Sequence, residues 1–284
     1  MWRKIRILLD MIKFEHTIFA LPFAFTGAFL AAGGVPPWEK SLLILGAMVG
    51  ARTAAMTFNR IVDLSFDAEN PRTKTRPLVT GEVRKRDAWI LFLVAVAVFF
   101  LCAKALNPLT FKLSPIALFV ILAYSYTKRF TWLCHVFLGL AIGLAPLAGW
   151  IAVKPSFDLV PVLLSVGVLF WVAGFDILYA CLDEEFDRQK GLYSIPAKFG
   201  RRKAFLISAT FHALAFLLFA LVGYLSQLSW IYYLGLLITL ALFIAQRVVI
   251  SPQDLSRLDL SFFTFNGAIS VVLFLATAGA LLFK

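Results

Sequence analysis

Two short acidic motifs contain the side chains that are best suited to chemistry in this sequence. In the first motif, Asn59, Asp63 and Asp67 follow one another at intervals of four residues. On a helix this spacing places an amide oxygen and two carboxylates along one face. Hard oxygen ligands of this kind suit Mg²⁺, which keeps part of its coordination shell for water and substrate phosphates. The first motif therefore predicts a site for a divalent cation together with a phosphate-bearing ligand.

The second motif repeats this pattern in the other half of the chain. Tyr179, Asp183 and Asp187 have the same spacing, and Asp176 precedes Asp183 by about two helical turns. Carboxylates that crowd together repel one another and raise one another's pKa unless a cation joins them. The duplication therefore favours bound metal over two solvated helix ends.

Basic residues follow both motifs. Arg72, Lys74 and Arg76 come directly after the first motif, and Lys190 comes after the second. Guanidinium and ammonium groups beside a divalent cation can hold a diphosphate and neutralise its charge as it leaves. The two motifs and their basic neighbours are thus consistent with one diphosphate-binding site.

The elements that must position these motifs are apolar runs long enough to cross a bilayer. Hydrophobic residues make up 61% of the 284 residues and charged residues only 15%, whereas soluble domains are about 25% charged. The pattern predicts an all-α integral membrane protein, a bundle of nine transmembrane helices in a single domain, 1–284, with half-bundles at roughly 1–130 and 131–284. The predicted spans are roughly 17–33, 41–58, 88–105, 113–127, 132–152, 158–179, 203–222, 229–249 and 262–282.

The distribution of basic residues sets the expected orientation. Most of the 27 Lys and Arg residues fall in the N-terminal segment and in the loops 59–87 and 180–203, on one side of a nine-span topology. The positive-inside rule places that side in the cytoplasm. Both acidic motifs then lie at cytoplasmic helix ends. We expect a bacterial inner (cytoplasmic) membrane protein whose active site faces the cytoplasm.

The same bulk properties argue against other classes of protein. The net charge is +11, but the basic residues lie in short loops rather than on a solvated face, so we expect membrane lipid and no nucleic acid as partners. The three cysteines are far apart and indicate neither a disulfide framework nor a metal site. A multi-span cation or metabolite transporter is the alternative from another class. It would carry carboxylates near the membrane centre and halves of inverted topology, unlike the two motifs here.

The combined pattern resembles the UbiA superfamily of intramembrane aromatic prenyltransferases. The resemblance rests on N-x-x-x-D-x-x-x-D-x-x-x-x-R-T-x-x-R-P, from Asn59 to Pro77, and on Y-x-x-x-D-x-x-x-D, from Tyr179 to Asp187. Within the superfamily the chain is most similar to the 4-hydroxybenzoate polyprenyltransferases, and the hydroxynaphthoate branch of the menaquinone pathway is the alternative. One departure is Arg60, where many members have Asp, so we assign Arg60 no metal role.

The resemblance implies a reaction and a set of roles. The chain would transfer a polyprenyl group from an allylic polyprenyl diphosphate to an aromatic acid such as 4-hydroxybenzoate, in ubiquinone biosynthesis, through an allylic carbocation. The Mg²⁺ ligands would be Asn59, Asp63, Asp67, Asp183 and Asp187. The diphosphate or the acceptor would be contacted by Asn59, Arg72, Arg76, Lys128, Arg129, Tyr179 and Lys190. Asp176 or a motif aspartate would take the ring proton.

Overall fold

The computed structural model describes every residue except 1, 14–16, 18 and 284. The described part of the chain is helical and contains no β-strand. Within it, eight helical segments are long and apolar enough to cross a membrane, which fits an integral membrane protein. They include α3 (Trp38–Val62), α6 (Lys85–Leu106), α7 (Pro108–Thr127), α8 (Cys134–Val153), α9 (Leu159–Tyr179), α12 (Arg201–Leu225), α13 (Trp230–Val249) and α15 (Asn266–Leu282).

These eight segments match eight of the nine predicted spans, and the first span differs. Helix α2 (Leu21–Ala32) has 12 residues, about 18 Å at 1.5 Å per residue, against about 30 Å for the hydrocarbon core. It begins at Leu21 because Pro22 favours the first turn of a helix and cannot continue one from before. Residue 18 of the predicted span lies outside the described residues, as do residues 14–16 just before the span. The count of nine spans is therefore approximate.

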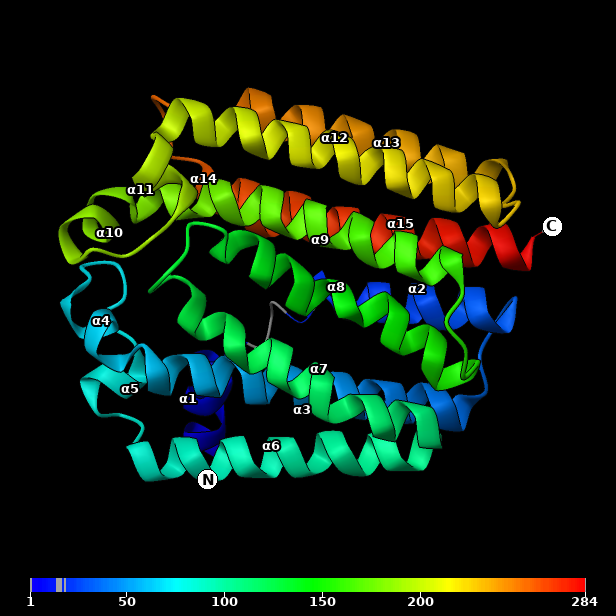
Figure 1. The fold of residues 1–284 in the computed structure, drawn as a ribbon, viewed down its shortest axis with the longest axis horizontal. Helices are drawn as coiled ribbons and strands as arrows, with labels where there is room; N and C mark the ends of the chain where they lie inside the picture. Colours follow the sequence, from blue (N-terminus) through cyan, green and yellow to red (C-terminus); the bar gives the residue numbers. More distant parts are fainter. Residues whose placement is uncertain (1, 14–16, 18, 284) are drawn as a thin grey trace.

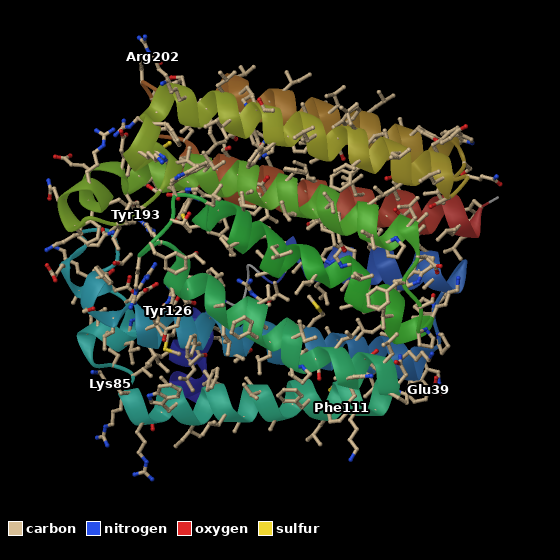
Figure 2. The ribbon with its side chains drawn as sticks, in the orientation of Figure 1. Glu39, Lys85, Phe111, Tyr126, Tyr193 and Arg202 are labelled. Atoms are coloured by element: carbon tan, nitrogen blue, oxygen red, sulfur yellow. The ribbon has the colours of Figure 1, made fainter. Side chains whose placement is uncertain are left out.

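Short helices gather at one end of the bundle. Figure 1 shows α4 (Leu64–Glu69), α5 (Pro77–Thr80), α10 (Glu184–Lys190) and α11 (Ile195–Phe199) together at the left, where the long helices that precede them end. Helix α1 (Trp2–Met11) contacts α5. We call this the capped end. In Figure 2, Lys85 and Arg202 lie at this end and Glu39 lies at the opposite one.

Helices α2 and α8 pack side by side with almost no space between their backbones. A Cβ on Gly27 would come within 1.9 Å of the Pro146 carbonyl oxygen, and one on Gly149 would come within 1.9 Å of the Ala24 carbonyl oxygen. Small residues at such crossings are the usual means of close helix association in membranes. The contact holds α2 against α8.

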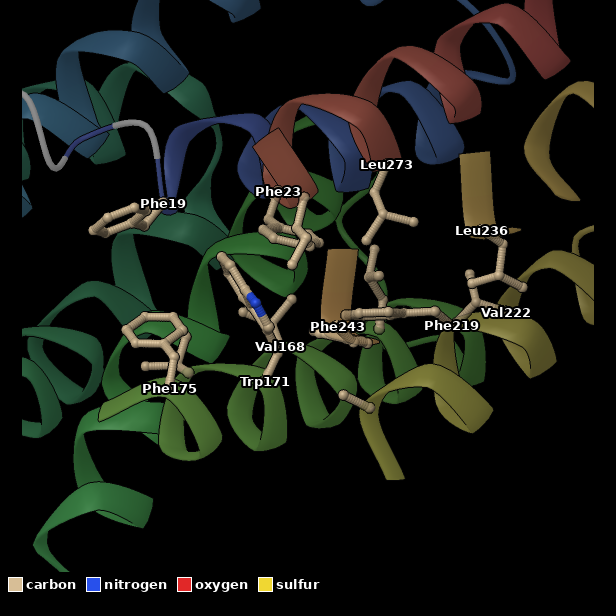
Figure 3. Packing of buried hydrophobic residues seen from close by; sticks show 14 residues of the cluster. Phe19, Phe23, Val168, Trp171, Phe175, Phe219, Val222, Leu236, Phe243 and Leu273 are labelled. Atoms are coloured by element: carbon tan, nitrogen blue, oxygen red, sulfur yellow. The ribbon is translucent and has the colours of Figure 1, made fainter. Parts of the chain in front are cut away.

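The main hydrophobic core joins α2, α9, α12, α13 and α15. Figure 3 shows its aromatic centre, where Phe23 lies against Trp171 and Phe219. A polar contact crosses this core, because Trp171 Nε1 donates to Asn266 Oδ1 at 3.2 Å. Asn266 directly follows a π-helical segment, η3 (Ser261–Phe265), and its Nδ2 donates to the Phe262 carbonyl at 3.0 Å. The core thus fixes the position of α9, whose end carries the second acidic motif.

Candidate active site

Each acidic motif lies at a break between a long helix and a short one. Helix α3 ends at Val62 and α4 starts at Leu64, and Asp63 between them has φ −91° and ψ 6°. In the second motif α9 is followed by a 3₁₀ turn, η2 (Ala180–Leu182), and Asp183 has φ −104° and ψ 4° before α10. These values lie in the bridge region, where many active-site residues are found. The expected straight helical face is therefore bent at the first aspartate, in the same way in both motifs.

The bend brings the two motifs together. Asn70 Nδ2 donates to Asp183 Oδ1 at 2.9 Å. Arg72 donates to the same carboxylate through Nε, at 2.9 Å, and through Nη2, at 2.5 Å. This bidentate geometry makes arginine–carboxylate contacts strong. An ion pair between Glu69 and Lys190 also joins α4 to α10. The two acidic helix ends therefore meet across one pocket.

All four motif aspartates form ion pairs with basic residues that the sequence predicted to bind substrate. The pairs, with their N···O distances, are Arg72–Asp183 (2.5 Å), Arg76–Asp67 (2.5 Å), Lys128–Asp187 (2.7 Å) and Arg129–Asp63 (3.0 Å). Four positive and four negative groups thus cancel one another. A ligand that contains both a cation and a polyanion offers each of these groups a replacement partner.

The surroundings shift the pKa values of these groups in different directions. Burial raises the pKa of the Asp63 carboxyl and of the Asp187 carboxyl. For Asp183, burial acts in the same sense, but the hydrogen bonds and charge of Arg72 outweigh it and hold the pKa below the ordinary value. For Lys128, burial is outweighed by Asp187, which raises the pKa of the ammonium group. Asp183 and Lys128 therefore stay charged around neutral pH.

Two adjoining cavities open around these charges. The smaller, of about 150 Å³, is lined by the first motif, by Asp183 and by the basic side chains between them. The larger, of about 630 Å³, shares Asn59, Asp63 and Asp183 with the smaller one. Its volume is within the range of small-molecule sites. The larger cavity extends along α9 to Asp176 and Tyr179.

Aromatic side chains line the larger cavity beyond the charged groups. Phe262, from the π-helical segment, lies against Tyr179 with ring centroids 4.2 Å apart. It also contacts Phe175 at 5.3 Å and Phe19 at 5.5 Å. The larger cavity thus combines aromatic faces with charged side chains, and Arg72 lies over the Tyr179 ring, 5.2 Å from its centroid.

Most of the predicted site residues line these cavities. Those that line at least one of them are Asn59, Asp63, Asp67, Arg72, Arg76, Lys128, Arg129, Asp176, Tyr179 and Asp183. Asp187 and Lys190 line neither cavity. Asp187 is fully buried and pairs with Lys128, and Lys190 pairs with Glu69.

Sequence reasoning gave no site role to Asn70, His135, Arg60 or Ser125, although each contacts a predicted site residue. Asn70 bonds Asp183, and its place three residues after Asp67 was a signal that could have found it. His135 Nδ1 lies 2.7 Å from Asp176 Oδ2, and no spacing in the sequence indicated that pair. Arg60 Nη1 donates to Asn59 Oδ1 at 3.3 Å.

The oxygen-rich set suits a hard divalent cation by its chemistry. Asn59, Asp63, Asp67 and Asp183 present amide and carboxylate oxygens to one cavity, and such ligands are those of Mg²⁺. In the part of the chain that the structure describes, no group of three His, Cys, Asp or Glu side chains is close enough to hold a metal ion. As the side chains stand, these carboxylates are paired with basic residues instead.

The chain resembles known proteins in sequence and in fold. The sequence model described as the UbiA prenyltransferase family matches residues 20–280. The chain is 33% identical over 250 residues to the 4-hydroxybenzoate octaprenyltransferase of Escherichia fergusonii, covering 88% of this chain and 85% of that protein. Its fold matches the apo structure of a UbiA homolog from Aeropyrum pernix K1 with a TM-score of 0.84 and 36% identity, over 92% and 96% of the two chains. A UbiA homolog from Archaeoglobus fulgidus, solved with GPP and Mg²⁺, has the same fold, with a TM-score of 0.74 and 22% identity over 96% and 99%.

Proposed function

The chain belongs to the UbiA prenyltransferase family, and we propose that it transfers a polyprenyl group from an allylic polyprenyl diphosphate to an aromatic acid such as 4-hydroxybenzoate. The observation that carries this proposal is the meeting of Asp63 and Asp183, with their basic partners, in a pocket that continues into an aromatic cavity. The name of the Escherichia fergusonii relative supports the acceptor. The GPP and Mg²⁺ in the Archaeoglobus fulgidus homolog support the donor and the metal.

The internal ion pairs provide the groups that hold the diphosphate. Arg72, Arg76, Lys128 and Arg129 exchange their carboxylate partners for phosphate oxygens when the donor binds. Lys190 pairs with Glu69 outside both cavities. The freed carboxylates of Asp63, Asp67, Asp183 and Asp187, with Asn59 as a further oxygen ligand, would hold Mg²⁺. When bound, Mg²⁺ supplies positive charge that stabilises the leaving diphosphate.

The larger cavity fits the carbon chemistry of the transfer. The allylic C–O bond breaks, its electron pair leaves with the diphosphate, and an allylic cation remains. Tyr179, Phe175 and Phe262 present aromatic faces that stabilise a cation and exclude water. An electron-rich ring carbon of the acceptor then forms the new C–C bond. Asp176, on the wall of this cavity, takes the ring proton and restores aromaticity.

The capped end of the bundle is proposed to face the cytoplasm of a bacterial inner membrane. Lys85 and Arg202 lie at that end (Figure 2), and positively charged loops are retained on the cytoplasmic side. The diphosphate would then be taken up and released on the cytoplasmic side, while the isoprenoid tail, being lipid-soluble, reaches the cavity from the bilayer.

Product formation in membranes tests the proposal. Membranes that contain the protein are given an allylic polyprenyl diphosphate, Mg²⁺ and, separately, 4-hydroxybenzoate, a hydroxynaphthoate or homogentisate. We expect prenylated 4-hydroxybenzoate, no product after chelation, and recovery when Mg²⁺ is restored. Product with the hydroxynaphthoate alone would instead assign the acceptor to the menaquinone branch. Absence of product with every acceptor, or turnover that ignores the chelator, would contradict the proposal.

A further inference from the structure

His135, near the start of α8, has both ring nitrogens occupied by protein groups. Its side chain is almost completely buried, at 2% exposure. Nδ1 lies 2.7 Å from Asp176 Oδ2. Nε2 accepts a hydrogen bond from the backbone N–H of Ile195, at 3.2 Å. His135 therefore has no nitrogen left for a ligand, although it lies next to the larger cavity.

The Ile195 contact determines which nitrogen carries the proton. A nitrogen that accepts a hydrogen bond must present its lone pair, so Nε2 is unprotonated. The ring proton is then on Nδ1, which donates to Asp176 Oδ2. A doubly protonated ring would place the Nε2 hydrogen against the Ile195 N–H, so the geometry favours the neutral ring.

This contact fixes one oxygen of Asp176 and leaves the other available. The Asp176 side chain is 23% exposed and lines the larger cavity. Among the described residues, His135 is the only hydrogen-bond partner of this carboxylate. Because the buried His135 ring holds Oδ2 of Asp176 through a hydrogen bond, the carboxylate does not rotate freely and Oδ1 keeps one direction.

The segment that holds His135 also touches the diphosphate side of the site. The Tyr193 N–H donates to the Lys128 carbonyl at 2.7 Å, two residues before Ile195. The side chain of Ser194 caps α11 by accepting from the Ala197 N–H at 3.3 Å. The backbone from Tyr193 to Ile195 is therefore rigidly placed, and with it the His135 ring.

We propose that His135 is a positioning residue, which uses its Nδ1–H to hold Asp176 so that Oδ1 accepts the proton lost by the acceptor ring. This inference rests on the proposed prenyl transfer. In that step the ring C–H bond breaks, its electron pair returns to the aromatic ring, and the proton goes to Asp176 Oδ1. His135 keeps its own proton throughout.

Two substitutions at position 135 separate this role from simple packing. His135→Asn keeps an N–H donor close to the place of Nδ1, whereas His135→Gln places its amide close to Nε2 and loses the donor to Asp176. We expect kcat to fall by about tenfold in His135→Gln, since general acid–base catalysis contributes about 10²–10⁴-fold and is only misaligned here. His135→Asn should retain most of kcat. The KM for the polyprenyl diphosphate should be unchanged in both, because its contacts lie elsewhere.

Two controls distinguish the outcomes. His212→Asn alters another buried histidine, which is stacked on Phe243 outside both cavities, and should leave kcat and both KM values unchanged. When Asp176→Asn is already present, adding His135→Gln should lower kcat little further, because the effect of His135 on kcat depends on Asp176.

Equal kcat in His135→Gln and wild type would overturn the inference. So would an equal fall in kcat for His135→Gln and His135→Asn, or full additivity with Asp176→Asn, each of which would mean that His135 only packs. Absence of turnover in the wild type would instead contradict the proposed function. Thermal unfolding of each variant shows whether it has folded.

Discussion

Asp63 and Asp183 occupy equivalent positions in the two motifs, yet their surroundings shift their pKa values in opposite directions. Both residues have nearly the same backbone angles and both precede a short helix. Burial dominates at Asp63 and raises its pKa. At Asp183 the bidentate contact with Arg72 outweighs burial and lowers the pKa of the carboxyl. The two motifs therefore repeat the same backbone geometry, whereas the surroundings of each aspartate decide the direction in which its pKa shifts.

This difference predicts opposite effects on the stability of the ligand-free protein. A raised folded-state pKa means that the charged form of Asp63 is less favoured in the folded protein than in the unfolded chain, so Asp63→Asn should raise the thermal unfolding temperature at neutral pH. The gain should shrink as the pH falls through the raised pKa, because the wild-type carboxyl then becomes neutral too. The measurement is thermal unfolding in detergent with chelator, from pH 7 downwards.

The matched variant Asp183→Asn should behave in the opposite way. A lowered pKa contributes stability that is present above the unfolded value of about 3.9 and is lost as the pH falls through the folded-state pKa. Asp183→Asn should therefore lower the unfolding temperature throughout the neutral range. A change in unfolding temperature of the same sign in Asp63→Asn and Asp183→Asn would contradict the opposite pKa shifts assigned to these two carboxyls.

Both variants should nevertheless lose prenyl transfer. Removing either carboxylate removes an oxygen ligand and leaves a basic partner without its counter-charge, so we expect kcat to fall by about 10²-fold or more. Asp158→Asn is the control, because Asp158 is partly exposed, pairs with Lys154 and lines neither cavity. Turnover by Asp63→Asn or Asp183→Asn at the level of Asp158→Asn would show that the site is assigned wrongly.

At the scale of elements, the close contact between α2 and α8 compensates for the short length of α2. A 12-residue helix contributes less apolar length than a full span, and its position depends on its neighbours. The segment before it supplies Met11, Lys13 and Phe19 to the larger cavity. The packing of α2 therefore positions part of the cavity wall.

A single added methyl group tests this contact. Gly149→Ala places a Cβ against the Ala24 carbonyl, and overpacking of this kind costs about 1–3 kcal/mol. We expect a lower unfolding temperature in detergent. Gly34→Ala, at a glycine with no atom within 4 Å of the added carbon, should change it little. Equal stability of the two variants would mean that α2 moves away from α8 without cost.

For the whole molecule, both cavities and the paired charges lie at the capped end of the helix bundle. Lys85 and Arg202 lie at that end and Glu39 at the other (Figure 2). The proposed site therefore lies at one end of the bundle, and under the proposed function the orientation of the chain decides which compartment supplies the diphosphate.

Labelling with a membrane-impermeant thiol reagent tests the orientation. We expect Glu39→Cys to react in intact cells and Arg202→Cys to react only after the membrane is opened, since basic loops stay in the cytoplasm. Both side chains are exposed. Cys134 and Cys181 are buried and Cys102 is partly buried, so the wild-type chain is the background control. The reverse pattern of labelling would place the site on the outer face.

The sequence by itself determined the class of fold, and it predicted the side on which basic residues gather and the residue types of the candidate site. Eight spans followed from local composition alone, because a lipid-crossing helix needs only a sufficient run of apolar residues. The two acidic motifs were found because Asp63 and Asp67, like Asp183 and Asp187, are close neighbours in the chain. Such features depend on short-range order and can be read directly from the sequence.

Only the tertiary structure decided which groups meet. Asn70 and Asp183 are 113 positions apart and yet bonded, and His135 reaches Asp176 from another helix. The bends at Asp63 and Asp183 and the short length of α2 likewise depend on the neighbouring helices that pack against these segments. Contacts of this kind are set by how whole helices cross, and helix crossings leave no periodic signal in the sequence, so the partners of each charge were settled only by the fold.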